Sequence, residues 1–267
     1  MGALVGHWPE YLMEAAGLGF FMLSACVVTV VMEHPQSPVR AAVADPTERR
    51  LLIGIAMGLT AAGLVYSPWG KRSGAHFNPT ITLTFLRLGR VEPWDAVFYI
   101  VAQFVGAIVG VFLAAVALGG TLSHAEVRYA MTRPEPLGRD IAFLAEFLIS
   151  LGLFTVVLLV SSVPRIARFT GLCSGALVAL FITVEAPLSG MSMNPARSLS
   201  SALPTRSWTA LWIYFTAPLL GMLTGVELYR TVSSRGVACA KLHHQNNYRC
   251  IFRCGYRRRG VRSYEPL

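Results

Sequence analysis

The chain has 267 residues, of which 54% are hydrophobic and only 14% are charged, whereas about 25% of the residues of an ordinary soluble domain are charged. Together with a mean hydropathy of +0.53, this composition excludes a disordered chain and argues against a soluble enzyme. The formal net charge of +9 does not indicate a nucleic-acid partner, because residues 231–267 alone hold eight Lys or Arg and one Glu.

Six apolar segments reach or approach the length of about 20 residues that a helix needs to cross a bilayer. They cover residues 11–32, 50–66, 94–118, 140–162, 169–186 and 207–229. Because lipid offers the backbone no hydrogen-bond partners, these segments are expected to be helices. Core helices of a large soluble protein are the alternative, but six such segments leave no polar shell. We therefore predict an all-α membrane protein.

Two further segments, 76–87 and 194–203, are too short to span a bilayer. Each contains an Asn followed at once by Pro, which is the pattern of a helix N-cap and a first helical residue. Half-helices are tolerated at membrane depth where they are buried in protein or line a water-filled cavity. We expect two re-entrant half-helices.

The two halves of the chain repeat one another. The pattern Ser-Gly-x-x-x-Asn-Pro at 73–79 recurs at 189–195, and Glu14 and Glu146 lie at similar depths in the first and fourth spans. Three spans and one half-helix in each half force the halves into opposite orientations, which places a binding or conduction site near the midplane. The predicted division is a first inverted repeat over 1–125, a second over 126–230 and a basic tail over 231–267.

The Lys and Arg residues predict an orientation. With six spans, both termini share one side with 15 basic residues, against 8 on the other side. The positive-inside rule then places both termini in the cytoplasm. The Ala-, Arg- and Leu-rich composition suggests a plasma membrane, and specifically the inner membrane of a bacterium.

At these motifs the sequence resembles the aquaporin (major intrinsic protein) family. The resemblance is carried by G-A-H-F-N-P-T at 74–80 and G-M-S-M-N-P-A-R-S at 190–198, and it covers residues 10–230. It departs from the family pattern at Thr80, where the family usually has Ala, and in the tail. The resemblance implies six transmembrane helices plus two re-entrant half-helices in an inverted repeat. It also implies a homotetramer of passive channels that needs no cofactor and is not an enzyme.

The two short signatures supply the expected pore motifs. They are Asn78, Pro79 and Thr80 in the first half, and Asn194, Pro195 and Ala196 in the second. Two inverted half-helices would point their N-termini, the positive ends of their dipoles, at one another. Amide donors at this point would orient a single file of water, and the dipoles would repel protons and other cations. Ordinary Asn-Pro turns in loops are the alternative.

The resemblance also implies a selectivity filter. It assigns Arg197, one turn after Asn194, as the filter arginine, with a snorkelling surface arginine as the alternative. The other three filter positions are Met57, Ile182 and Met191, with Gly58 replacing Met57 if one residue is inserted before the first motif. Such a filter is apolar and adaptable, since Met adjusts its shape.

The buried carboxylates Glu14 and Glu146 have two interpretations. As a catalytic pair they would suggest an intramembrane hydrolase. As the resemblance implies, they instead support the loops, each accepting hydrogen bonds from re-entrant backbone that cannot stay unpaired in lipid. His76 precedes the first motif and leaves a pH-sensing role open.

The tail combines basic residues with five Cys or His side chains. They are Cys239, His243, His244, Cys250 and Cys254. Four of them would suffice for tetrahedral zinc, but their spacing is looser than that of the usual C-x2-C knuckle. We therefore predict no metal site and expect the basic residues, 257–259 among them, to lie against anionic lipid headgroups, at about 1 kcal/mol per residue.

The predicted function is a passive channel that conducts water, leaves room for small uncharged solutes, and excludes protons and ions. The alternative within this class is a glycerol, urea or metalloid facilitator with low water flux. Outside it, the alternatives are a non-conducting membrane scaffold or adhesion protein whose pore Met57 and Met191 block, and a coupled transporter, which would need a titrating group facing the pore.

Overall fold

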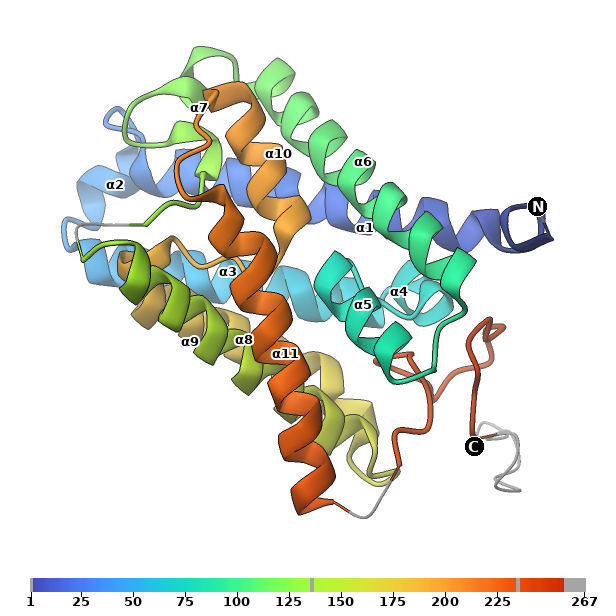
Figure 1. The fold of residues 1–267 in the computed structure, drawn as a ribbon. Coiled ribbons are helices and arrows are strands. Elements are labelled where there is room, and N and C mark those ends of the chain that lie inside the picture. The colour runs from blue at the N-terminus through green and yellow to red at the C-terminus, as the bar shows by residue number, and fades with distance from the viewer. Residues whose placement is uncertain (1, 135–136, 234–235, 257–267) are drawn as a thin grey trace.

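The computed structural model describes residues 2–134, 137–233 and 236–256, and these residues are helical or irregular, without a β-strand. Six helices are long and apolar enough to cross a membrane, which confirms the six predicted spans. They are α1 (Gly2–Glu33), α3 (Pro46–Tyr66), α6 (Pro93–Leu118), α8 (Arg139–Ser161), α9 (Thr170–Ser189) and α11 (Leu211–Val232) (Figure 1).

Two shorter helices, α5 (Pro79–Arg87) and α10 (Pro195–Thr205), are the expected half-helices. The connecting segments contain α2 (Pro38–Ala42), α4 (Pro68–Ser73), α7 (Gly120–Ser123) and the 3-10 turns Arg128–Ala130 and Ala167–Phe169. The first helix begins at Gly2, about two and a half turns before the expected start at residue 11. The prediction began at residue 11 because His7, Pro9 and Glu10 interrupt the apolar run there, yet the helix continues through them.

Most helix starts follow directly from the sequence. At α3 the Asp45 carboxylate accepts hydrogen bonds from the backbone of Thr47 (2.6 Å) and Glu48 (3.1 Å), and Pro46 takes the first helical position, where its missing N–H costs nothing. The half-helices begin in the same way, with Asn78 and Asn194 as caps, each followed by Pro. The Asn-Pro pairs therefore fix where both short helices start.

Glycines let the long helices approach closely in pairs. A Cβ atom on Gly58 of α3 would lie 2.4 Å from the carbonyl oxygen of Gly175 of α9, and the reverse distance is also 2.4 Å. At the α1–α6 contact a Cβ on Gly106 would lie 2.0 Å from the carbonyl oxygen of Ala15. At the α8–α11 contact Gly221 takes the same role. Small residues thus let helix backbones touch, as in other membrane helix pairs.

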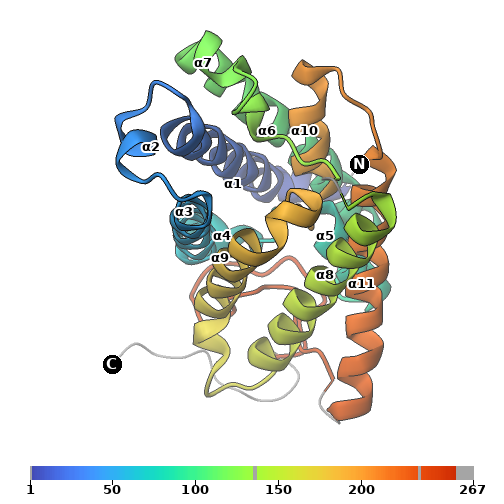
Figure 2. The same ribbon diagram turned by 90° about the vertical axis from the view of Figure 1, so that its left-hand side faces the viewer.

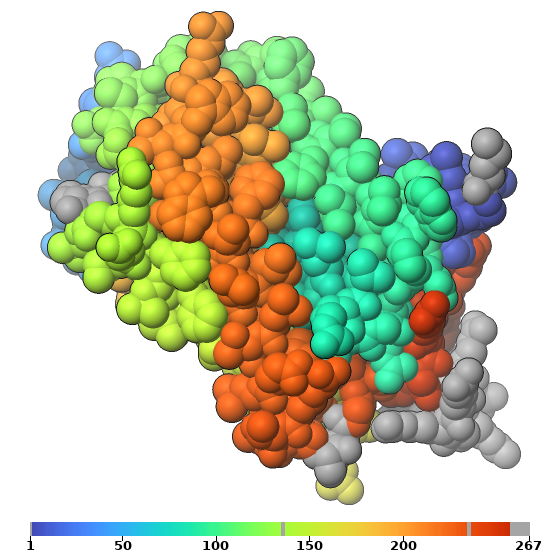
Figure 3. Space-filling view, viewed as in Figure 1, coloured from blue at the N-terminus to red at the C-terminus, as the bar shows by residue number. Residues whose placement is uncertain are grey.

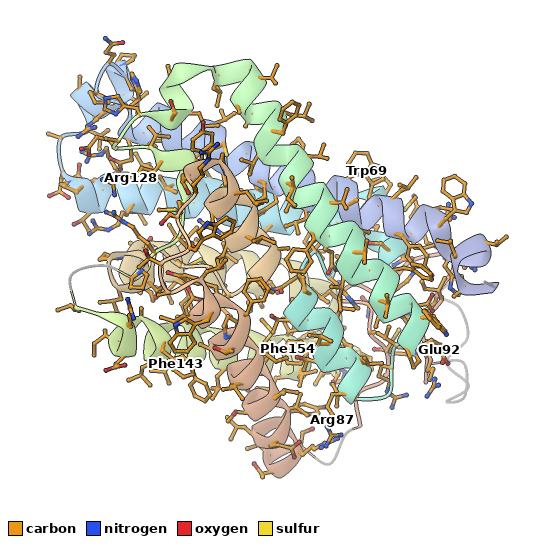
Figure 4. All side chains as sticks on the ribbon, turned by 45° about the horizontal axis from the view of Figure 1, so that its top comes forward. Trp69, Arg87, Glu92, Arg128, Phe143 and Phe154 are labelled. Carbon is orange, nitrogen blue, oxygen red and sulfur yellow. The ribbon has the colours of Figure 1, made fainter. Side chains whose placement is uncertain are left out.

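The long helices form a bundle around the two half-helices. In Figure 2, α1, α3, α9 and α8 follow one another around the bundle, and each packs against the next. Both α5 and α10 pack against α6 and α11. The interior contains buried aromatic rings such as Phe154 of α8, which is labelled in Figure 4. Its ring centroid lies 5.3 Å from that of Phe85 of α5. The outer surfaces of the long helices carry exposed apolar side chains that suit a lipid environment.

Residues 236–256, the described part of the tail, fold back across one end of the bundle. This end, called the tail end below, contains the start of α1, the end of α3 and the start of α6 (Figure 1). Figure 4 labels Arg87 and Glu92 there, at the end of α5 and the start of α6. In the space-filling view the tail, in red, lies beside α5 and α6 (Figure 3). The predicted lipid contact of residues 257–259 lies outside the described residues.

Candidate functional site

Two loops with matching backbone conformations lead into the half-helices. Each loop holds three residues in the left-handed region, at equivalent places in the repeat. They are Gly74, Ala75 and Phe77 in the first loop and Gly190, Met191 and Met193 in the second. Left-handed backbone is unfavourable for residues other than Gly, so the surrounding contacts must impose it at the four non-glycine positions.

Glu14 of α1 supplies such contacts to the first loop and is fully buried. One of its oxygens accepts hydrogen bonds from the Ser73 hydroxyl (2.7 Å) and the His76 backbone (3.1 Å). The other accepts from the Phe77 backbone (2.6 Å) and the Gln103 amide (2.8 Å). The four donors satisfy the carboxylate and, in return, two loop N–H groups are paired.

Glu146 of α8 makes the corresponding contacts to the second loop. It is also fully buried, and accepts from the Ser189 hydroxyl (2.7 Å) and from the backbone of Ser192 (2.7 Å) and Met193 (2.8 Å). No glutamine reaches it, because α11 has Pro218 where α6 has Gln103. The two buried carboxylates therefore lie in similar settings, each bonded to the backbone of its own loop.

Asn78 and Asn194 join the two loops reciprocally. The Asn78 side chain donates to the carbonyl of Met193 (2.7 Å), and the Asn194 side chain donates to the carbonyl of Phe77 (2.8 Å). Their side-chain oxygens are occupied as helix caps. Each amide has two N–H groups, and these contacts use one. The second N–H of each Asn is left for another acceptor.

The remaining residues of the two motifs shape the half-helix starts. Pro79 and Pro195 take the first helical positions, and Thr80 and Ala196 follow with backbone N–H groups that bond the caps. Thr80 is buried, as is Ala196, so the Thr that departs from the family pattern is accommodated in the interior. The six motif residues thus meet at the junction of the two halves.

A cavity of about 420 Å³ opens at the end of the bundle opposite the tail. Met57, Ile182, Met191 and Arg197 all line it. Gly58, the alternative to Met57, instead faces Gly175 at the α3–α9 contact. The Nη1 atom of Arg197 is buried and has no hydrogen-bond partner among the described residues. The structure therefore brings the four expected filter residues to one cavity and leaves a guanidinium N–H without an acceptor.

One buried carboxylate near the second loop was missed from the sequence. Glu185 of α9 is 4% exposed, has one oxygen 2.5 Å from the Ser189 hydroxyl oxygen, and has a second oxygen without a described partner. A Glu at the very end of an apolar span is typical of a membrane boundary, so its position gave no signal of burial. The Ser189 hydroxyl lies within hydrogen-bond distance of both Glu146 and Glu185, and its single hydrogen can be donated to only one of them at a time.

The tail covers the first loop from the tail end of the bundle. The ring of His76 stacks on that of Phe252, with centroids 5.2 Å apart, and its Nε2 lies 2.9 Å from the carbonyl oxygen of Ala240. The backbone of Leu242 donates to the carbonyl of Gly74 (3.1 Å). His76 therefore contacts the tail directly and is nearly fully buried.

Further contacts fasten the tail around the rim of the bundle. Arg253 donates to the Glu92 carboxylate (2.7 Å), and this hydrogen bond holds the pKa of Glu92 below its usual range. Other contacts reach the start of α1 and the α8–α9 connection: Arg249 with the Gly6 carbonyl, Gln245 with the Pro164 carbonyl, and Tyr256 with the Ser161 carbonyl. The described tail thus touches both halves of the chain.

Six helices long enough to cross a membrane, together with two half-helices whose preceding loops bond each other, define a multi-pass membrane protein of the channel type. The sequence profile described as "Major intrinsic protein" matches residues 4–229. The chain belongs to this family, the aquaporins, whose members are passive channels and not enzymes.

Similar proteins include two plant aquaporins. Aquaporin NIP1-1 of Arabidopsis thaliana is 35% identical over 185 residues, which cover 67% of this chain and 62% of that protein. Aquaporin NIP3-1 of Zea mays is 38% identical over 181 residues, which cover 67% of this chain and 58% of that protein. The matched part of the chain thus spans about three fifths of the length of these relatives.

A solved structure shares the fold. It is the X-ray structure of the aquaglyceroporin from Plasmodium falciparum, with a TM-score of 0.67 over 85% of this chain and 97% of that one. At 21% sequence identity, the likeness extends to the fold alone.

Proposed function

We propose that this protein is a passive channel that conducts water through the junction of its two loops. The observation that carries the proposal is the reciprocal contact of Asn78 and Asn194, which leaves one amide N–H of each residue available at the same point. Two donors side by side, at the N-termini of two inverted half-helices, favour a water molecule that accepts from both. Such a water points its own hydrogens away from the junction and does not relay a proton.

The proposed selectivity filter consists of Met57, Ile182, Met191 and Arg197. Its support is their common position on the cavity of about 420 Å³ and the unpartnered Nη1 of Arg197. The guanidinium supplies a donor to an uncharged permeant and repels cations, while the apolar side chains favour solutes with few polar groups. Small uncharged solutes are therefore proposed as secondary permeants, and a solute facilitator with low water flux is the alternative that the same lining accommodates.

Glu14 and Glu146 are proposed as loop supports and not as a catalytic pair. Each is enclosed by donors from its own loop. In a hydrolase, by contrast, both catalytic carboxylates would have to reach the same bound substrate.

The remaining proposals concern topology and assembly. We propose inverted repeats over 1–125 and 126–230, a cytoplasmic tail over 231–267, both termini in the cytoplasm and a homotetramer. The tail end is then the cytoplasmic mouth, as the basic residues there support. The relatives named above come from plants and lend no support to a bacterial inner membrane, which stays a prediction.

Stopped-flow light scattering on proteoliposomes tests the function. Because the tail covers one mouth, the parent protein is compared with Phe252→Ala, which removes the ring stacked on His76. Shrinkage in a sucrose gradient faster than that of empty liposomes, with a low activation energy, is the expected result in the variant. Shrinkage at the lipid rate in both proteins, with insertion verified, would contradict a water channel. In a glycerol gradient, re-swelling faster than that of empty liposomes would indicate a filter wide enough for glycerol, and re-swelling at the rate of empty liposomes would indicate a filter that passes water alone.

A further inference from the structure

Four tail side chains outside the conduction site converge on one point. The Nε2 atom of His244 and the sulfur atoms of three cysteines all lie within 4.8 Å of one another. This group, called the tail cluster below, consists of Cys239, His244, Cys250 and Cys254. The cysteines are free, and the sequence separation of up to 15 residues between the members shows that the fold of the tail, and not a local motif, assembles them.

The spacing within the tail cluster fits tetrahedral zinc. The sulfur atoms of Cys239 and Cys250 lie 3.5 Å apart, and the Cys254 sulfur lies 3.1 Å from Nε2 of His244. Zinc–sulfur bonds of about 2.3 Å and zinc–nitrogen bonds of about 2.0 Å place neighbouring ligand atoms of a tetrahedron about 3.5–3.8 Å apart. These two distances lie within about half an ångström of the tetrahedral values, and separations that approach the 4.8 Å limit of the cluster would shorten by about 1 Å around an ion.

We propose that the tail cluster binds one Zn²⁺ ion, and that the bound ion fastens the tail over the channel mouth. The Cys₃His donor set is soft and tetrahedral, which selects zinc over the hard cations Mg²⁺ and Ca²⁺. With four protein ligands the site is closed, which is the arrangement of a structural zinc site and not of a catalytic one.

A backbone donor beside the tail cluster supports a thiolate ligand. The backbone N–H of Lys241 donates a hydrogen bond to the sulfur of Cys239, at 3.5 Å. Such second-shell donors orient metal ligands and stabilise their negative charge.

The charges around the tail cluster also support a bound zinc ion. Three thiolates, one neutral imidazole and one Zn²⁺ carry a net single negative charge. Lys241, only 3% exposed, lies close enough to interact electrostatically with all three cysteines, and its Nζ donates to the carbonyls of Lys71 (2.8 Å) and Arg249 (2.8 Å). The buried ammonium thus offsets the charge of the loaded site and ties it to α4.

The structure distinguishes two adjacent histidines that the sequence spacing left equivalent. His244 points Nε2 at the tail cluster and stacks on Tyr256, with centroids 4.4 Å apart. His243 instead packs edge-on against Tyr66 of α3, with centroids 5.2 Å apart. The neighbours therefore form a matched pair for experiment, one a ligand and the other not.

The tail cluster lies between the two tail segments that cover His76. Cys239 directly precedes Ala240, whose carbonyl contacts His76, and Cys250 lies two residues before Phe252, whose ring stacks on it. Without the ion, these segments are held together by contacts such as the Gly255 N–H to the Ala238 carbonyl (2.7 Å). Metal release therefore loosens both covering segments together. This second half of the inference rests on the proposed channel function.

Metal content tests the site. Full-length protein is purified under reducing conditions, loaded with zinc sulfate, desalted and measured by mass spectrometry of the metal. One zinc per chain is expected in the parent, in His243→Ala and in Cys173→Ser, a cysteine outside the cluster. His244→Ala and Cys250→Ser should bind zinc at least about tenfold more weakly. No zinc in the parent, or equal zinc affinity in all five proteins, overturns the site.

Proteolysis tests the fastening without using flux. Lys241 is buried in the covered state, so trypsin should cut after it about tenfold faster once a chelator removes zinc from the detergent-solubilised parent. Cys250→Ser should be cut fast with or without zinc, and His243→Ala should behave like the parent. Cleavage of the parent that does not change with zinc overturns the fastening.

Water flux tests closure of the mouth. Zinc-loaded parent proteoliposomes should shrink near the lipid rate and several-fold faster after chelation, whereas Cys250→Ser should be fast in both conditions. Fast shrinkage of the parent with zinc bound overturns closure. The channel function could also fail alone. In that case the liposomes with Cys250→Ser, Phe252→Ala and the chelated parent would all shrink at the lipid rate. Zinc content and tryptic cleavage would still behave as expected, and the metal site would stand.

Discussion

Gly58 and Gly175 face each other across the α3–α9 contact so closely that a Cβ atom on either would lie 2.4 Å from the other's carbonyl oxygen. We expect Gly58→Ala to push the two helices apart and to destabilise the fold by about 1–3 kcal/mol. Gly63→Ala on the same helix is the control, because nothing lies within 4 Å of its added Cβ. Thermal midpoints in detergent should fall for the first variant and hold for the second. Equal thermal midpoints for the two variants would mean that α3 and α9 can move apart without loss of stability.

Arg197→Ala should weaken selectivity, since it removes from the cavity a guanidinium whose Nη1 atom is buried and without a described partner. The ratio of glycerol to water permeability and the leak of protons into dye-loaded proteoliposomes should both rise. The measurement is made in the Phe252→Ala background so that the tail does not limit flux. Arg139→Ala, an exposed position at the start of α8, serves as control. Unchanged selectivity in Arg197→Ala would place the filter elsewhere.

Met191→Ala should widen the same cavity and raise glycerol flux more than water flux, because the long side chain lines it and is 5% exposed. Met13→Ala, on α1 away from the cavity lining, should leave both fluxes unchanged. Stopped-flow shrinkage and re-swelling report the two permeabilities, again in the Phe252→Ala background. A fall in both fluxes would instead show that Met191 holds the second loop in shape.

Glu146→Gln should destabilise the second loop, since it replaces an acceptor of two backbone N–H groups and a hydroxyl with a group that also donates. A cost of about 1–3 kcal/mol is expected. Glu185→Gln is a matched control, because that carboxylate lies beside no described donor except the Ser189 hydroxyl, and the new amide nitrogen can replace its unpartnered oxygen. The monodisperse fraction on size exclusion and the thermal midpoint should fall further for Glu146→Gln than for the control. The reverse order would make Glu185 the more important support.

Much of the fold was predictable because membrane helices leave strong local signals. Each long helix needs a long apolar run, and each half-helix starts at an Asn-Pro pair that caps it. The carboxylates Glu14 and Glu146 could be picked out because a charge inside such a run needs partners.

The less regular features depended on tertiary contacts that no short pattern encodes. Glu185 looks like a boundary residue until α9 is packed against α8. The tail has no helical or strand periodicity, and its position follows from single contacts such as Phe252 on His76. Likewise, only the folded tail separates His244 from His243 and brings Cys239 to Cys250.

The reciprocal contact between the loops has a consequence for how mutations combine. Asn78 and Asn194 each bond a carbonyl in the opposite half of the chain, so a change in one loop alters the partner of a residue more than a hundred positions away. Substitutions at Asn78 and Asn194 are therefore expected to be non-additive, with the second costing less than the first once the loss of one bond has loosened the loop that accepts the other. The two halves behave as a single energetic unit at their junction, although each has its own helices, its own carboxylate and its own cap.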